Sequence, residues 1–320
     1  MPAVDWPRAQ LESYRPPQSK QPDFSEFWRR TLDAHQHPFD AIEEHVDYPA
    51  AGITVSKVTF RGYGQGRVAG WLLVPDSASK LPGMVMFHGY TGNRGAIFDA
   101  AAWALHGFVT LAIDVRGQTG ESTHPDADPS GHAPGWMTEG IRSPETYYYR
   151  AVYVDCVRSV QFLQAHSRVD AKRVGCTGAS QGGGLTLATA ALEPSVALAM
   201  AEVPYLCDFP RAVEVANIPG GRITYAEIAA YCRAYPDRYD EAFRTLTYFD
   251  VVNLADRIAC PTLVCVGLWD PICPPSTVYA AFNHLKAEPR LLDVFPYLDH
   301  AVTSTHRDEK VRWAARHLQS

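Results

Sequence analysis

The sequence has few of the features that mark nucleic-acid-binding and membrane proteins. Its 29 lysines and arginines are outnumbered by 35 aspartates and glutamates, its formal net charge is −6, and it has no basic cluster. This composition argues against a nucleic-acid partner. No apolar run is long enough to span a bilayer, and residues 1–8 lack the apolar core of a signal peptide. We therefore expect a cytoplasmic protein without a membrane partner.

Patterned metal ligands are also missing. The seven cysteines form no C-x-x-C pair, and most lie in apolar runs, which favours buried free thiols over disulfides or a zinc site. His35 and His37 are the closest histidine pair, but no acidic or cysteine partner is patterned around them, so we interpret them as surface residues. The sequence thus predicts a protein without metal or cofactor.

What the sequence does contain is a nucleophile elbow. Residues 178–182 read Gly-Ala-Ser-Gln-Gly, a G-x-S-x-G pattern centred on Ser180. A serine that attacks a carbonyl projects from a tight strand-to-helix turn, which leaves no room for side chains two residues before and after it. An apolar strand pattern at residues 173–177 precedes the motif, and a buried helix pattern at 185–192 follows it. The alternative is a glycine-rich packing turn with an incidental serine.

Alternating strand and helix patterns from residue 83 onward predict a doubly wound, mostly parallel α/β sheet. A proline-rich arm and a short amphipathic helix occupy residues 1–40, and antiparallel strands follow. The antiparallel strands are expected at 43–48, 54–61 and 67–74, the later strands at 84–88, 108–113, 173–177, 197–203, 262–267 and 290–295, and the later helices at 143–166, 276–287 and 304–318.

We interpret residues 1–320 as one domain, because single α/β domains often reach this size. Residues 204–255 interrupt the alternation and contain helical patterns at 225–235 and 237–246. Such an insertion beside the elbow is expected to act as a cap or an interface element, which shapes the pocket without supplying the chemistry.

The chain also offers an acid and a base in the order that α/β-hydrolases use, in which the serine is followed by an aspartate or glutamate and then by a histidine. Asp270 follows the predicted strand 262–267, and His300 follows the predicted strand 290–295. Both therefore lie at the carboxyl edge of the sheet, where the elbow emerges. We predict that Ser180 attacks, His300 is the base, and Asp270 orients the imidazole.

Other residues could fill these roles. Asp270 precedes Pro271 and could be a turn initiator. The weaker candidates are Asp299, Asp208 and Asp256 for the acid, and His306 and His284 for the base.

The oxyanion formed by this attack needs hydrogen-bond donors. One is expected to be the backbone N–H of Gln181, and the other the N–H of Tyr90, in the loop after strand 84–88. Gly89 lets that loop turn close to the substrate, and His88 is interpreted as a structural residue. A plain strand-to-helix turn is the alternative.

The segment Arg116-Gly117-Gln118 follows the next predicted strand. An arginine at such a place can hold several loops by forked hydrogen bonds. We therefore expect Arg116 to be part of the scaffold rather than a substrate contact.

Taken together, these segments resemble carbohydrate esterase family 7, the acetyl xylan esterase and cephalosporin C deacetylase group. The combination of Arg-Gly-Gln with Gly-x-Ser-Gln-Gly-Gly is far more specific than the elbow alone. The resemblance covers nearly the whole chain and includes residues 22–28, 70–75, 116–118, 140–141, 147–150, 178–183, 203–207 and 270–278.

The resemblance implies Ser180, Asp270 and His300 as the triad and Tyr90 and Gln181 as oxyanion donors. It also implies that residues 204–255 form a β-interface insertion, and that the protein is a hexamer whose active sites open to an inner cavity. In one respect the sequence departs from the family, because Ala301 follows His300 where a glutamate is usual.

The expected function is removal of acetyl groups from small esters through an acyl-enzyme. Acetylated xylo-oligosaccharides, acetylated sugars and cephalosporin-type acetyl esters are the candidate substrates. A general short-chain carboxylesterase, a thioesterase or a peptidase would use the same triad with a different pocket. A non-catalytic binding protein that keeps the fold is the remaining alternative.

Overall fold

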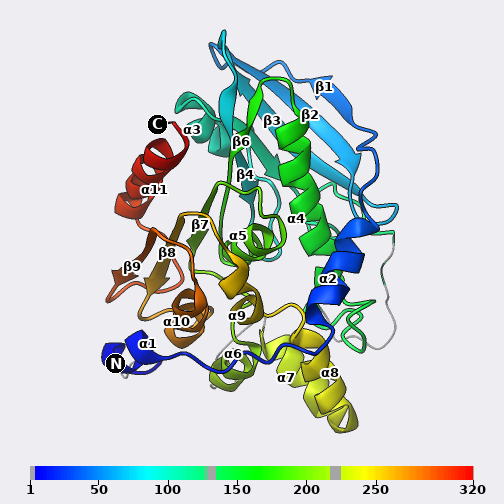
Figure 1. Cartoon of the computed structure of the whole chain (residues 1–320), viewed down its shortest axis with the longest axis vertical. Coiled ribbons are helices and arrows are strands. Elements are labelled where there is room, and N and C mark those ends of the chain that lie inside the picture. Colours follow the sequence, from blue (N-terminus) through cyan, green and yellow to red (C-terminus); the bar gives the residue numbers. More distant parts are fainter. Residues whose placement is uncertain (1–3, 126, 128–134, 217–224, 320) are drawn as a thin grey trace.

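The computed structural model describes residues 4–125, 127, 135–216 and 225–319, and a mixed nine-stranded sheet runs through it (Figure 1). The strand order is β1-β2-β3-β5-β4-β6-β7-β8-β9. Strands β1 to β3 are antiparallel to their neighbours, and all pairs from β5 to β9 are parallel. The predicted α/β architecture is confirmed. The strands are β1 (Ile42–His45), β2 (Ile53–Arg61), β3 (Arg67–Pro75), β4 (Leu81–Phe87), β5 (Val109–Ile113), β6 (Val169–Ala179), β7 (Leu198–Glu202), β8 (Thr262–Gly267) and β9 (Arg290–Phe295).

Helices cover both faces of this sheet, as expected for parallel strands that are apolar on both sides. One cluster of buried residues packs α3 and α11 against the sheet through Trp103, Met200 and Trp313. The larger cluster includes α4 and α5 on the opposite face. The α-helices are α1 (Arg8–Ser13), α2 (Phe24–Asp33), α3 (Ile97–Leu105), α4 (Tyr148–Ala165), α5 (Gln181–Leu192), α6 (Phe209–Ala216), α7 (Tyr225–Ala234), α8 (Tyr239–Leu246), α9 (Val251–Leu254), α10 (Pro275–His284) and α11 (Ser304–Leu318).

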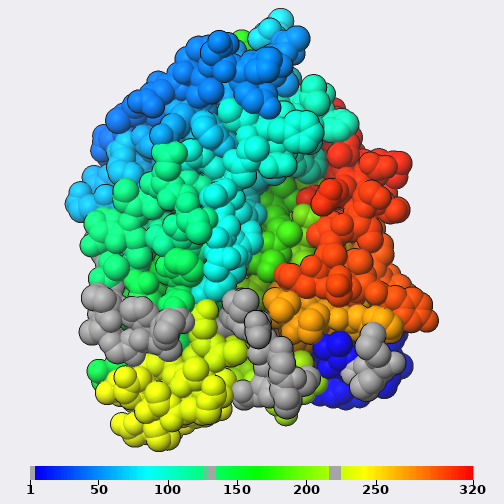
Figure 2. Space-filling model, turned by 180° about the vertical axis from the view of Figure 1, so that it is seen from behind, coloured from blue at the N-terminus to red at the C-terminus, as the bar shows by residue number. Residues whose placement is uncertain are grey.

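The chain reverses its winding direction at β4, because β5 pairs with one edge of β4 and β6 with the other. In doubly wound sheets the loops that follow two such strands diverge and leave a crevice at the carboxyl ends. The loops that carry Tyr90 and Ser180 begin at this point. Seen from behind, the surface is hollowed between the cyan segment after β4 and the orange-to-red C-terminal segment (Figure 2).

The helix predicted at residues 143–166 begins later than expected. Residues 144–146 form a turn, Tyr147 has an extended backbone (φ −63°, ψ 131°), and α4 starts at Tyr148. Tyr147 points its hydroxyl to Met137 O at 3.0 Å and is buried. The Ser-Pro-Glu start signal is therefore overridden by tertiary contacts of the tyrosine that follows it.

The insertion between β7 and β8 comprises α6 to α9, and the N-terminal arm runs along it (Figure 1). Gln18 Nε2 donates to Val252 O at 2.7 Å, and the Trp28 indole donates to Tyr248 O at 3.0 Å. The two helical patterns predicted in the insertion correspond to α7 and α8. The six-residue helix α1, within the arm, was not indicated by the sequence pattern.

All seven cysteines are free, as predicted, and six of them are buried. In the described part of the chain, no helix has the length and apolar character needed to cross a membrane.

Candidate active site

Ser180 lies at a strained turn between β6 and α5. Its backbone has φ 57° and ψ −119°, in a region that side chains other than glycine avoid unless the surroundings enforce it. The two flanking glycines are required by the close approach of β4. A Cβ atom on Gly178 would lie 2.4 Å from Phe87 O, and one on Gly182 would lie 2.1 Å from the same atom. The turn therefore has the geometry of the predicted nucleophile elbow.

Asp270 and His300 form a close pair at the carboxyl ends of β8 and β9. His300 Nδ1 lies 2.7 Å from Asp270 Oδ2, and the Asp270 side chain is fully buried. The other carboxylate oxygen accepts the backbone N–H groups of Ile272 and Cys273, each at 2.8 Å. The Asp270 carboxylate therefore supports the turn through one oxygen and binds His300 through the other.

The Cys273 thiol lies beside this pair. The candidate ligand atoms of Asp270, Cys273 and His300 all lie within 4.8 Å of one another, and the Ser180 side chain lies close enough to the thiol to affect its pKa. Burial raises the pKa of the Cys273 thiol well above its ordinary value, so the thiol is neutral. The structure therefore pairs two of the predicted triad residues, Asp270 and His300, and places Cys273 beside them.

Asp270, Cys273 and His300 are also ligand types that metal ions use. His300 Nδ1 and Asp270 Oδ2 are already bonded to each other, which is the arrangement of an acid that orients a base. The weaker candidates are placed elsewhere. His306 pairs with Asp293 at 2.7 Å, His284 Nδ1 lies 2.8 Å from Ala280 O, Asp208 accepts the Tyr14 hydroxyl, Asp256 pairs with Lys20, and Asp299 is exposed.

The two predicted oxyanion donors lie beside the elbow. A Cβ on Gly89 would be 3.9 Å from Ser180 Cβ, so the loop after β4 passes directly over the serine. Among the described residues, the N–H groups of Tyr90 and Gln181 have no hydrogen-bond acceptor, which leaves them available to an oxyanion. His88 fixes the start of this loop: its Nε2 accepts from Val115 N at 2.8 Å, and burial lowers the pKa of the imidazole.

Gln118 joins the two sides of the oxyanion site. Its Oε1 accepts the N–H of Thr91 at 2.9 Å, and its Nε2 donates to Gln181 Oε1 at 2.8 Å. Both amide side chains are buried, at 9% and 0% exposure. One side chain therefore holds the residue after Tyr90 and the residue after Ser180 at a fixed separation.

Arg116 is buried and pairs with Asp155 through two nitrogens, at 2.6 and 3.0 Å. It also donates to Tyr63 O at 3.2 Å. Gly117 has φ +69°, which glycine adopts without strain. These contacts support a scaffold role for the Arg-Gly-Gln segment.

Two tyrosines extend this network. The spacing of residues in the sequence did not predict their contacts with Arg116 and Gln181. Tyr149 donates its hydroxyl to Gln181 Oε1 at 3.0 Å, and Tyr148 donates to Arg116 O at 2.5 Å. Both lie at the start of α4 and are buried. Three consecutive tyrosines in a buried segment were the available signal, because a buried hydroxyl needs a partner.

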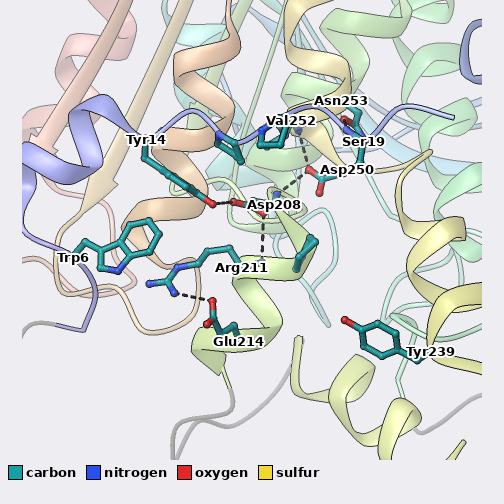
Figure 3. A pocket seen from close by; sticks show the side chains of 13 residues that line it. Trp6, Tyr14, Ser19, Asp208, Arg211, Glu214, Tyr239, Asp250, Val252 and Asn253 are labelled. Carbon is teal, nitrogen blue, oxygen red and sulfur yellow. Dashed lines mark hydrogen bonds and ion pairs between the residues drawn. The ribbon is translucent and has the colours of Figure 1, made fainter. Parts of the chain in front are cut away.

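A second hollow lies between the N-terminal arm and α6, and none of the predicted triad residues lines it (Figure 3). Its volume is about 550 Å³. Within it, Tyr14 donates its hydroxyl to Asp208 Oδ2 at 2.9 Å. The neighbouring Asp250 accepts three backbone N–H groups, and burial, reinforced by Asp208, raises the pKa of Asp250 to about 7.

The family model described as acetyl xylan esterase (AXE1) matches residues 1–317. The chain is 29% identical over 312 residues to the acetyl esterase Axe7A of Xylanibacter ruminicola, covering 95% of this chain and 69% of that protein.

Solved structures give the same result. An acetyl xylan esterase from Paenibacillus sp. R4 superposes with a TM-score of 0.92 at 38% identity, over 98% of this chain and all of that one. Acetyl xylan esterase 1 from Thermoanaerobacterium sp. JW/SL YS485 superposes with a TM-score of 0.93 at 31% identity, over 99% of this chain and all of that one. The chain therefore belongs to the acetyl xylan esterase (AXE1) family and is a carboxylic ester hydrolase of the α/β-hydrolase fold.

Proposed function

We propose that the protein is a serine esterase that removes acetyl groups from small O-acetylated substrates. The observation that carries the proposal is the family match over residues 1–317, which includes Ser180, Asp270 and His300. The pairing of His300 Nδ1 with Asp270 at 2.7 Å supports the same assignment.

In the proposed reaction, His300 takes the proton of the Ser180 hydroxyl as the oxygen attacks the acetyl carbonyl. The carbonyl oxygen becomes an oxyanion that the N–H groups of Tyr90 and Gln181 stabilise. Collapse of this intermediate breaks the ester bond, and His300 returns the proton to the leaving alcohol. Water then attacks the acetyl-enzyme by the same route and releases acetate.

Asp270 serves this cycle by fixing the imidazole tautomer. A hydrogen bond from Nδ1–H to the buried carboxylate leaves Nε2 unprotonated and able to act as a base. The carboxylate also stabilises the imidazolium that forms in each half-reaction.

The finer assignments rest on family resemblance. We propose acetylated xylo-oligosaccharides, acetylated sugars or cephalosporin-type acetyl esters as substrates, carbohydrate esterase family 7 as the subgroup, and a cytoplasmic homo-hexamer as the assembly. Light scattering after gel filtration tests the hexamer: a particle six times the 35.4 kDa chain is expected, and a monomer peak would contradict it.

The activity is tested with p-nitrophenyl esters of two to eight acyl carbons. We expect turnover confined to the shortest esters, and a loss of about 10⁵–10⁶ in kcat for Ser180→Ala. Near-full activity of that variant would show that Ser180 is not the nucleophile. Rates that rise with acyl length would indicate a general carboxylesterase instead.

A further inference from the structure

Glu227, on α7 of the insertion, binds the hydroxyl of Tyr90 with both carboxylate oxygens. The hydroxyl lies 3.0 Å from Oε1 and 3.0 Å from Oε2. The same carboxylate accepts the N–H of Met137 at 3.1 Å, and the Tyr90 hydroxyl accepts the N–H of Trp136 at 2.7 Å. Three segments that are distant in sequence therefore meet at one hydrogen-bonded cluster.

This cluster restrains the residue whose backbone N–H is a proposed oxyanion donor. The Tyr90 ring packs edge-on against Trp136, with the ring centroids 5.4 Å apart. Burial and the Glu227 carboxylate raise the pKa of Tyr90 well above its ordinary value, so the hydroxyl stays protonated and donates. With the ring and the hydroxyl both held, the direction of the Tyr90 N–H is restricted as well.

The next residue shows why such a restraint is needed. Thr91 has φ +63°, which is costly for a β-branched residue. Its N–H is held from the other side by Gln118. The loop after β4 is thus strained between two polar contacts, Gln118 on the side of the elbow and Glu227 on the side of the insertion.

The same helix also contacts the loop behind the elbow. Leu206 donates its N–H to the Tyr225 hydroxyl at 2.9 Å, and Tyr205 donates its N–H to Ser180 O at 2.9 Å. Tyr225 and Tyr205 lie against each other with centroids 4.2 Å apart. Through Glu227, α7 therefore contacts the loop that carries Tyr90, and through Tyr225 it contacts the loop after β7 that lies against the Ser180 backbone.

We infer that Glu227 is a positioning residue for the oxyanion site, acting through the Tyr90 hydroxyl to aim the Tyr90 N–H at the developing negative charge. We class it as a positioning residue rather than a catalytic one, because it acts on the oxyanion site through the Tyr90 hydroxyl. The inference rests on the proposed function. It gives the insertion a share in the chemical step, which exceeds the pocket-shaping role expected from the sequence.

The test compares Glu227→Ala, Tyr90→Phe and the double variant by their kcat and KM for p-nitrophenyl acetate. Misplacing one oxyanion donor costs about 10–100-fold in kcat, with KM changed by less than about threefold. The double variant should lose no more than the worse single variant, because both changes break one contact. Glu227→Gln keeps an acceptor oxygen and should fall between Glu227→Ala and the unaltered protein.

Binding of methylboronic acid provides the readout that a purely structural role would not move. This reagent forms a tetrahedral adduct on an activated serine, so its affinity should fall in parallel with kcat. Glu241→Ala is the matched control, because it removes a carboxylate of the same insertion that pairs at the surface with Arg142. The control should keep the kinetics of the unaltered protein.

Several results would overturn the inference. One such result is that Glu227→Ala folds and keeps a kcat within threefold of that of the unaltered protein. Another is that the fold-losses in kcat of the two single variants multiply in the double variant. If Glu227→Ala does not fold, Tyr90→Phe and Glu227→Gln decide by the same criteria. These results leave the proposed function intact as long as Ser180→Ala abolishes acetyl-ester turnover. If the unaltered protein does not hydrolyse acetyl esters, both the proposed function and the inference about Glu227 are overturned.

Discussion

The two oxygens of the Asp270 carboxylate have separate tasks. Oδ1 accepts two backbone N–H groups of its own turn, and Oδ2 binds His300 Nδ1. The turn therefore aims the carboxylate, and the carboxylate aims the imidazole. Asp-Pro in the sequence was a correct sign of a turn, and the turn is what supports the pairing.

Asp270→Asn should separate these tasks. The amide oxygen can still accept the two backbone N–H groups, so the melting temperature should change little. The amide nitrogen would face His300 Nδ1 and favour the tautomer that is protonated on Nε2, which cannot act as a base. We expect kcat to fall by about 10⁴, measured with p-nitrophenyl acetate. An unchanged rate would transfer the acid role to Asp299.

Gly182→Ala tests the tightness of the elbow. The new Cβ would lie 2.1 Å from Phe87 O, a backbone atom of β4 that has no rotamer to move. Overpacking of this kind costs about 1–3 kcal/mol or more, and we expect a matching fall in stability by urea denaturation. Gly89→Ala is the control for stability, because its Cβ would meet its nearest neighbour at 3.8 Å. Equal stabilities of the two variants would contradict the argument.

At the scale of the elements, strands were predicted more reliably than helix starts. The apolar runs that became β5, β8 and β9 are bounded by glycine, proline and polar residues, and this local pattern survives in the fold. The start of α4 depends instead on where Tyr147 finds a partner for its hydroxyl, which is Met137 O. The order of Ser180, Asp270 and His300 was readable because each follows a strand, whereas Glu227 lies inside a helix and resembles any exposed acid until α7 is placed.

The buried pair between Arg116 and Asp155 fastens the loop after β5 to α4. Arg116→Met should cost about 3–5 kcal/mol, because it leaves a buried carboxylate without its main partner. Arg116→Met combined with Asp155→Leu removes the orphaned charge and should recover part of that loss. Urea denaturation of the three proteins measures both effects, and a double variant no more stable than the single one would contradict the explanation.

At the scale of the whole molecule, the N-terminal arm and the insertion form one layer with shared polar contacts. The buried Asp250 lies at its centre, beside Asp208, which Tyr14 of the arm binds. The amino-acid composition could not show that Asp250 would be buried. A carboxyl group buried between an insertion and a distant arm shows only when both are in place.

Asp250 should make stability depend on pH. Its pKa is raised to about 7 in the folded chain and is about 3.9 when unfolded, so the folded state binds the proton more tightly. The stabilisation is complete below about pH 4 and is lost as pH rises through 7. Asp250→Asn should lower stability overall but remove this part of the pH dependence. Melting curves between pH 4 and 8 measure it, and equal slopes for the two proteins would contradict it.

The contacts of the arm also bear on how the chain reaches its fold during synthesis. Trp28 pairs with a carbonyl 220 positions later, and Gln18 with one 234 positions later. Both arm residues are therefore synthesised long before the carbonyl groups that they bind. Until then the indole N–H of Trp28, whose side chain is 1% exposed in the folded chain, lacks its final acceptor, and contacts across such separations slow folding. We therefore expect the arm to complete its contacts late in folding, after the part of the insertion that carries Tyr248 and Val252 has been synthesised.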